Sequence, residues 1–309
     1  MFNKLWHNKK TVLKLLSWLH FLSRRGLLVL AWQQRLLFKV VDQYDRIREQ
    51  EIYDKYQVTI DKYQDDTFLA EASTEPAKII WVLWWQGADQ MPQIIQATLK
   101  SMHDHAGDYQ VTLIDQHNFQ QYLTVPTEIL AKVETGAVGL AAFSDYLRYA
   151  LLAQYGGIWL DATMYLVADI PAFDDALEVV LPKHVNTHSS IRYSPIFQRY
   201  QHTFIKARKN TLFMRYMVDV ITTYLLTEPR VNRYPYAYDI ALLGFEHVPR
   251  LTAMFDQIPA RVNFDMEAFE ELTVMPRGSY REFTETFAYK LTYKDEAAVE
   301  KLNKVFELA

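Results

Sequence analysis

An acid and a base three positions apart mark the segment 143–163 as the part of the chain most able to do chemistry. Asp145 and Arg148 would be neighbours on one face of a helix. The surrounding residues are mostly apolar, so both charged groups need partners inside the protein. The segment continues into a short apolar run that ends in Asp161. Spacing alone leaves two interpretations open: a structural ion pair beside an ordinary strand-end turn, or a polar functional site.

Two adjacent glycines divide this segment into a helix and a strand. Residues 140–155 have helical character, and Gly156 and Gly157 follow at the place where a left-handed residue usually ends a helix. Residues 158–161 then read as a buried strand. The sequence therefore predicts that Asp161 lies at the carboxyl end of a strand that directly follows the helix of Asp145 and Arg148.

The preceding residues predict the rest of an α/β fold. Residues 78–85 form a continuous apolar run, which is typical of a parallel strand covered on both faces. A helix at 92–105, a strand at 110–115 and a helix at 126–134 follow. Alternating strands and helices predict a Rossmann-like, mostly parallel sheet flanked by helices.

The carboxyl ends of such strands are where ligands bind in open α/β sheets. Trp84, Trp85 and Asp161 are all expected there. Adjacent strand residues point to opposite faces, so at least one of the two tryptophans packs in the core. His184, His188 and His202 do not have a spacing that is typical of metal ligands.

Composition bounds the fold and excludes several classes of site. Half of the 309 residues are hydrophobic and 14% are aromatic, which supports a large core and excludes wholesale disorder. The chain has no Cys, which excludes disulfides, Cys-ligated zinc, iron–sulfur clusters and thiol nucleophiles.

The charge is distributed unevenly along the chain. Residues 1–41 contain eight of the 33 Lys and Arg residues and none of the 37 Asp and Glu residues. Their apolar residues recur at helical spacing. We therefore expect a basic amphipathic helical segment at 1–60, a polar boundary at 61–76 and the main domain at 77–309.

The basic segment is too interrupted by charge to cross a membrane. Its longest charge-free stretch near the middle, residues 26–34, is about half of the roughly 20 residues that a bilayer core needs. Two interpretations remain. The segment is either a helical hairpin packed on the domain or an interfacial anchor, with Trp6, Trp18, Phe21 and Trp32 at headgroup level and the cations of residues 1–41 on anionic lipid. Nucleic acid is not an expected partner, because the rest of the chain is acidic.

The segment 143–163 resembles the signature of sugar transferases of glycosyltransferase family 32, including capsular polysaccharide synthesis proteins; clostridial glucosylating toxins share a related version. That signature runs Ser-Asp-x-x-Arg, a helix, Gly-Gly, an aromatic residue and Asp-x-Asp. The matching positions are Ser144, Asp145, Arg148, Gly156, Gly157, Trp159 and Asp161. The apolar strand that ends in Trp84 and Trp85 is also similar to the first strand of the capsular proteins.

This resemblance implies a GT-A fold and a retaining transfer of a hexose from a nucleotide diphosphate sugar, with UDP-galactose and UDP-glucose as leading donors. It implies a donor site made of Trp84, Trp85, Ser144, Asp145, Arg148, Asp161, Ala162 and Thr163. Trp84, ahead of Trp85, would stack on the base, and Asp145 and Arg148 would bind ribose or sugar hydroxyls. Asp161 and Arg148 would support the chemistry, with Asp239 and His247 as candidates on the acceptor side.

One position departs from the family pattern. Thr163 stands where many members have the second acid of Asp-x-Asp. The resemblance implies a Mn²⁺ or Mg²⁺ ion on the donor diphosphate, held by Asp161 and Thr163. Hard cations take oxygen ligands and retain water, so a single carboxylate with a hydroxyl could still hold one, more weakly than two acids.

The resemblance also implies a role in capsular or exopolysaccharide synthesis. A saccharide acceptor linked to lipid would explain a basic segment that attaches the protein to the inner face of the cell membrane, in the cytoplasm. Two alternatives are a toxin-like transferase that acts on protein, and an inactive sugar-nucleotide-binding or membrane-scaffold protein. Donor hydrolysis separates the enzymes from the scaffold, and the choice of acceptor separates the two enzymes.

Overall fold

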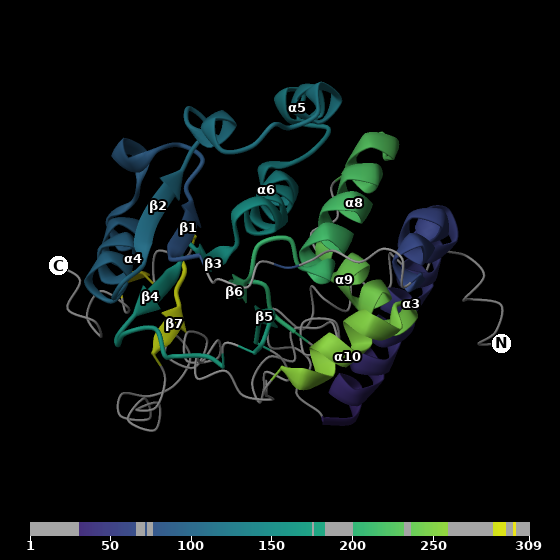
Figure 1. The fold of residues 1–309 in the computed structure, drawn as a ribbon. Helices are drawn as coiled ribbons and strands as arrows, with labels where there is room; N and C mark the ends of the chain where they lie inside the picture. The colour runs from purple at the N-terminus through teal and green to yellow at the C-terminus, as the bar shows by residue number, and fades with distance from the viewer. Residues whose placement is uncertain are drawn as a thin grey trace.

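A five-stranded sheet lies at the centre of the described residues of the computed structural model (Figure 1). The structure describes residues 31–65, 72, 77–174, 176–182, 200–231, 236–258, 287–294 and 299–300, with side chains from residue 46 onward. The strands of this sheet are β1 (Ile79–Leu83), β2 (Gln110–Ile114), β3 (Gly157–Asp161), β5 (Val179–Val180) and β6 (Phe204–Ala207). A separate pair consists of β4 (Met164–Leu166) and β7 (Ala288–Lys290).

Helices surround the sheet on both faces. In chain order they are α3 (Ala31–Asp61), α4 (Gln93–Asp104), α5 (Thr127–Glu134), α6 (Leu140–Tyr155), α8 (Leu212–Thr227), α9 (Tyr236–His247) and α10 (Pro249–Gln257). Short 3-10 turns lie at η1 (Lys62–Gln64), η2 (Ala88–Gln90) and η3 (Phe119–Gln121).

The sheet is mostly parallel. Its order is β2-β1-β3-β6-β5. Strand β1 runs parallel to both of its neighbours, β2 and β3. Strand β6 runs antiparallel to β3 and to β5, so β6 alone is reversed among these five strands. The predicted α/β class with a mostly parallel sheet is confirmed.

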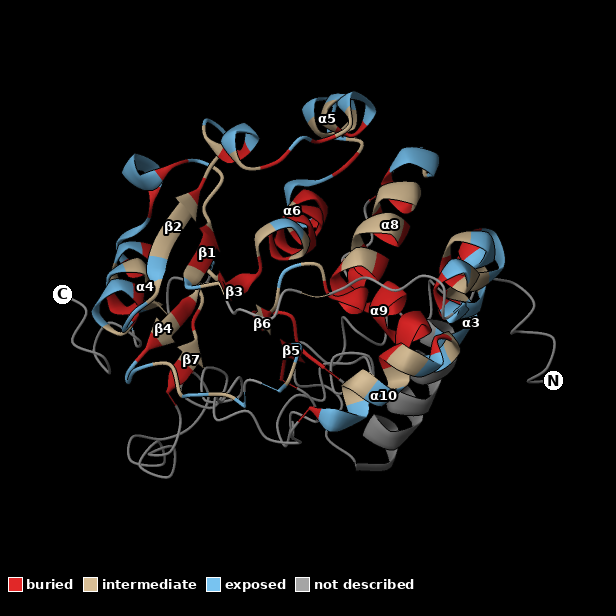
Figure 2. Ribbon diagram, in the orientation of Figure 1, coloured by how far each residue is buried: buried red, intermediate tan, exposed pale blue. Residues whose placement is uncertain are grey.

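Alternating side chains divide the core into two layers. Ile80, Val82, Ile158 and Leu160 pack on the face where α4 contributes Met102. Trp81 and Trp159 point to the other face, where α6, α8 and α9 supply the largest apolar cluster. The buried sides of α6, α8 and α9 face this layer (Figure 2). Residues of β3 with odd numbers therefore face α6.

The predicted elements around the sheet are confirmed. The strand expected at 78–85 is β1, the strand at 110–115 is β2, and the strand at 158–161 is β3. The helices expected at 92–105, 126–134 and 140–155 are α4, α5 and α6. The differences are at most a few residues at the ends, where sequence signals are weakest.

The second half of α3 packs on the domain. Ile52, Tyr56, Ile60 and the following Tyr63 are buried in the large cluster. The Tyr63 hydroxyl donates to Asp219 of α8 at 2.5 Å. In Figure 1, α3 lies beside α9 and α8, and both helices contact it. This half of the helix is therefore part of the core.

The basic segment expected at 1–41 falls largely outside the described residues. Residues 1–30 are not described, and only the helical backbone of residues 31–45 is. Within the described part of the chain, no helix is both long enough and apolar enough to cross a membrane. Attachment of residues 1–41 to lipid stays a prediction.

The two glycines between α6 and β3 are required by close backbone contacts. Gly156 and Gly157 have φ of 74° and 100°. A Cβ on Gly157 would lie 2.5 Å from the carbonyl oxygen of Ile79 in β1, and one on Gly156 would lie 2.6 Å from the amide nitrogen of Lys209. Glycine here lets β3 start directly after the helix while it pairs with its neighbours.

We expect Gly157→Ala to lower the free energy of unfolding by about 2–3 kcal/mol, because it adds a backbone clash to an unfavourable φ. Gly107→Ala is the matched control: Gly107 has φ of 56° but open space around its Cβ position. That variant should lose only about 1 kcal/mol. Denaturant unfolding measures both, and equal losses would contradict the close contact with β1.

Candidate functional site

Asp161 lies at the edge of the sheet where parallel strands end. It is the last residue of β3 and pairs with Leu83, the last residue of β1. Trp84 and Trp85 follow Leu83 directly. The register therefore brings both tryptophans and Asp161 to the same carboxyl edge, as the sequence predicted.

Arg148 joins two carboxylates from different elements. Its Nη1 donates to Asp145 Oδ1 at 2.6 Å, within α6. Its Nη2 donates to Asp161 Oδ1 at 2.9 Å, across to β3. The side chain of Arg148 is only 4% exposed. The ion pair of Asp145 and Arg148, which the spacing left as one of two interpretations, exists, and Asp161 is its second acid.

Trp159 fixes the orientation of Asp161. The two residues are two apart on β3, so both face α6. The indole Nε1 of Trp159 donates to Asp161 Oδ1 at 2.9 Å. The Arg148 guanidinium carbon lies 4.9 Å from the centre of the Trp159 ring, in a cation–π arrangement. Oxygen Oδ1 thus accepts from both Arg148 and Trp159.

Lys290 supplies the partner of the other carboxylate oxygen. Its Nζ donates to Asp161 Oδ2 at 2.6 Å. Strand β7 carries Lys290 to this place because it pairs with β4, where Lys290 is opposite Met164. No pattern in the sequence indicates this residue. It lies 129 positions after Asp161, and only the pairing of two three-residue strands connects them.

The electrostatics of this cluster favour an ionised Asp161. Burial alone would raise its pKa, but Lys290 and Arg148 outweigh burial and hold the pKa well below its usual range. The two aspartates raise the pKa of Arg148 further, against its burial. Burial raises the pKa of Asp145 to about 6, although Arg148 opposes this shift.

A buried histidine lies beside Asp145. The Nε2 atom of His202 is 3.7 Å from Asp145 Oδ1, and its ring lies 4.0 Å from that of Tyr238. Burial, and then the positive charge of Arg148, lower the pKa of His202 well below its usual value. His202 is therefore neutral at physiological pH. Its spacing to other histidines gave no signal, because its neighbours come from α6 and α9.

The side chains of the two tryptophans after β1 point to opposite faces of the sheet, as expected for adjacent residues of an extended chain. Trp85 packs against Phe119 and Phe143, with ring centres 5.4 and 5.5 Å away. Trp84 lies on the other side, 5.2 Å from Tyr293 in an edge-on contact. Its indole nitrogen is buried without a hydrogen-bond partner among the described residues. Trp84 is thus the tryptophan with an unused donor at this edge.

The turn after Asp161 is held by its backbone. The Ala162 carbonyl accepts from Thr98 Oγ1 at 2.6 Å, and the Thr163 carbonyl accepts from the Leu291 amide at 2.8 Å. The hydroxyl oxygen of Thr163 is buried and has no hydrogen-bond partner in the described part of the chain. Ser144 is half-buried, directly before Asp145.

The two expected acceptor-side residues lie on α9, at different distances from this cluster along the helix. Asp239 is fully buried in the first turn, next to Tyr238, which contacts His202. His247 lies at the other end and stacks on Tyr53 of α3, with ring centres 3.9 Å apart. The described contacts therefore connect α9 to the cluster through Tyr238, and connect His247 to α3.

The arrangement, as described, does not fit a divalent cation at Asp161. One carboxylate oxygen accepts from two N–H donors, and the other is held by the Lys290 ammonium. Within the described residues, no group of three or more His, Asp or Glu side chains is placed to hold a metal ion. The ion expected at Asp161 and Thr163 would have to displace Lys290. Metal binding there stays a prediction.

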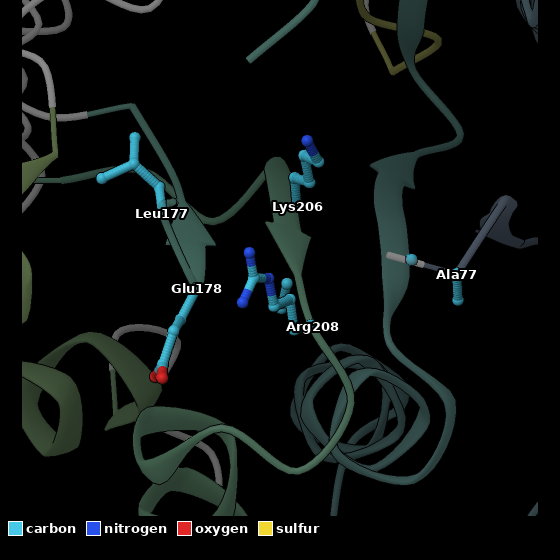
Figure 3. A pocket seen from close by; sticks show the side chains of 7 residues that line it. Ala77, Leu177, Glu178, Lys206 and Arg208 are labelled. Atoms are coloured by element: carbon cyan, nitrogen blue, oxygen red, sulfur yellow. The ribbon is translucent and has the colours of Figure 1, made fainter. Parts of the chain in front are cut away.

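A small pocket lies elsewhere on the sheet. Figure 3 shows it beside the start of β3 and the end of β6. Its lining residues are Ala77, Gly157, Leu177, Glu178, Lys206, Ala207 and Arg208. Gly157 begins the strand that Asp161 ends. The pocket is therefore at the opposite edge of the sheet from the charged cluster.

Comparison with known proteins identifies a family. The family model described as "Capsular polysaccharide synthesis protein" matches residues 31–307. No curated protein matches the chain. Among matching solved structures is one titled "PaToxG Glycosyltransferase", with 14% sequence identity and a TM-score of 0.41, over 85% of this chain and 95% of that one. Nothing about activity follows from a structural likeness at this level.

We expect Arg148→Met to lower the free energy of unfolding by about 3–5 kcal/mol, because it leaves two buried or half-buried carboxylates without their shared partner. The exposed ion pair of Lys78 with Asp108, at 2.7 Å, provides the control. Lys78→Met should leave stability nearly unchanged, because exposed pairs contribute little. If denaturant unfolding shows similar small losses for both, the Arg148 bridge does not stabilise the fold.

Proposed function

The chain belongs to the capsular polysaccharide synthesis protein family, and from that premise we propose that it is a retaining glycosyltransferase of the GT-A type. It transfers a hexose from a nucleotide diphosphate sugar, with UDP-galactose and UDP-glucose as the first donors to test. The acceptor is a saccharide linked to lipid. The product belongs to capsular or exopolysaccharide synthesis.

One observation supports this proposal most directly. An ionised Asp161 is held between two cations, Arg148 and Lys290, at the carboxyl edge of a mostly parallel sheet. Ligands of open α/β sheets bind at this edge. Charged groups held in fixed positions there can stabilise the charge that develops as a sugar nucleotide reacts.

The reaction breaks the bond between C1 of the sugar and the diphosphate, and it forms a bond from C1 to the acceptor oxygen, which loses its proton to the departing diphosphate or, through water, to solvent. The leaving diphosphate gains negative charge. Lys290 is the less buried of the two cations on Asp161, with its side chain 23% exposed, so it is the one that donor oxygens can reach. Arg148, at 4%, holds Asp161 in place.

The remaining donor contacts are assigned to the same edge. Trp84 stacks on the base in this proposal, because Trp85 is occupied by Phe119 and Phe143. Ser144, Ala162 and Thr163 surround the ribose and diphosphate. In this proposal Asp145 does not touch the donor; it holds the Arg148 guanidinium in place.

The acceptor side is assigned to α9. Tyr238 and Asp239 lie near the cluster, whereas His247 is placed with α3. Asp239 is fully buried, so its proposed part is to position Tyr238 beside His202.

We expect Asp161→Asn to reduce donor turnover at least about 100-fold, because it removes the charge that orients Lys290 and Arg148. Hydrolysis of UDP-galactose and UDP-glucose, with and without Mn²⁺, measures the loss. Asp108→Asn, at an exposed ion pair, is the matched control and should retain activity. Near-normal turnover in folded Asp161→Asn would place the reaction elsewhere.

Membrane attachment through residues 1–41 is the second part of the proposal. A soluble donor and a lipid-linked acceptor require the enzyme to work at the inner face of the membrane. Each Lys or Arg close to an anionic leaflet contributes about 1 kcal/mol, and this attraction is screened by salt. The eight cations of this segment are enough for reversible attachment.

We expect the protein to sediment with anionic vesicles at low salt and to be released at 1 M salt. A first variant replaces five cations of the segment with Gln: Lys9, Lys10, Lys14, Arg24 and Arg25. It should stay in the supernatant and still hydrolyse donor.

A control variant loses the same number of positive charges from the described surface. Gln replaces five exposed lysines in it: Lys62, Lys78, Lys100, Lys209 and Lys294. It should still sediment. If both variants stay in the supernatant, attachment reflects net charge alone; if the first variant sediments as the parent does, the segment is not the anchor.

A further inference from the structure

We propose that the ammonium group of Lys290 takes the place of a divalent metal ion in the donor site, so that the protein binds a nucleoside diphosphate without metal. This inference rests on the proposed function and names the group that binds the diphosphate. It differs from the expectation that the family pattern raises, in which two acids hold the cation.

The first observation is the coordination of Asp161. A carboxylate that binds a metal ion needs an oxygen turned toward that ion. Here Oδ1 accepts from Arg148 and Trp159, both at 2.9 Å. Oδ2 accepts from Lys290 at 2.6 Å, so both oxygens of Asp161 already have cationic or N–H partners.

The second observation is the charge balance. Asp145 and Asp161 contribute two negative charges, and Arg148 and Lys290 contribute two positive charges. A divalent ion would add two more positive charges next to two fixed cations, and these would repel it. A cation-binding site of the two-acid kind has the opposite balance.

The third observation is the residue at position 163. A second acid here would repel the diphosphate unless a metal ion lay between them. Thr163 carries no charge, and its hydroxyl is buried without a partner among the described residues. The neutral residue at position 163 and the ammonium of Lys290 therefore both favour binding of an anion over binding of a cation.

The fourth observation is that Lys290 is held in position. Strand β7 pairs with β4, which follows the turn after Asp161 (Figure 1). The Leu291 amide donates to the Thr163 carbonyl at 2.8 Å, so the backbone next to Lys290 is fixed to the same turn. Among the described residues, Asp161 is the hydrogen-bond partner of Lys290, and the ammonium has two further N–H groups for phosphate oxygens.

The test is calorimetric titration of the full-length protein with UDP, in EDTA and in Mn²⁺. The wild-type protein should bind UDP in EDTA, with an affinity within about threefold of that in Mn²⁺. Lys290→Met should bind UDP in EDTA about 10- to 100-fold more weakly, because it loses a charge-assisted contact. Lys290→Arg should recover most of the affinity, because it restores the positive charge.

Two further variants sharpen the result. Lys100→Met removes an exposed lysine that is paired with Asp104 on α4, and it should bind UDP as the wild type does. Lys290→Met combined with Thr163→Asp restores a two-acid site without the lysine. This double variant should bind UDP only when Mn²⁺ is present. Thermal unfolding confirms that each variant is folded.

The outcomes are distinct. Wild-type binding that requires Mn²⁺ overturns this inference and leaves the glycosyltransferase proposal standing; this comparison holds even if Lys290→Met does not fold. Equal binding by folded Lys290→Met and by the wild type in EDTA also overturns it. Failure to bind UDP or UDP-sugars in either condition overturns the proposed function, and the inference with it.

Discussion

The buried guanidinium of Arg148 is the constraint on which the site depends. It is bound by one carboxylate from its own helix and by another from the strand that follows, and the Trp159 ring lies against it. A buried charge without a partner is costly, so none of these groups can move far without the others. The ion pair of Asp145 and Arg148 is therefore more than a local contact within α6. Through Arg148 it fixes the position of α6 relative to β3 and the orientation of the Asp161 side chain.

The backbone makes this bridge possible by keeping the helix and the strand close. The helix ends at Tyr155, and β3 begins at Gly157, so Arg148 and Asp161 are separated by a single tight reversal. Backbone atoms of Ile79 and Lys209 leave no room for a Cβ at Gly157 and Gly156. The same contact sets β3 in register with β1, which brings Trp84 to the edge where Asp161 ends. The strand pairing of β3 and the ion pair of Arg148 with Asp161 thus both depend on the tight turn at Gly156 and Gly157.

Charge balance separates this site from one built for a metal ion. Two acids and two bases meet, and the more exposed base, Lys290, comes from a strand far along the chain. Arg148 is too enclosed to serve a ligand and acts as the support of Asp161, whereas Lys290 is the cation at the surface of the cluster. Thr163 in the adjacent turn leaves this balance unchanged. The neutral Thr163 and the Lys290 ammonium are parts of one electrostatic arrangement.

The sequence by itself determined the elements that hold the site. Hydrophobic periodicity and the glycine pair predicted α6, β3, β1 and the edge they share, because these signals are local and each element follows directly from its own residues. The i,i+3 spacing also predicted that Asp145 and Arg148 are neighbours on one helix face, with an ion pair as one of two interpretations. Lys290 and His202 could not be found in this way. They reach Asp161 and Asp145 only through the pairing of β7 with β4 and of β6, which follows His202, with β3. Contacts across such distances in the chain leave no periodic trace, so tertiary structure alone decided which cation meets Asp161.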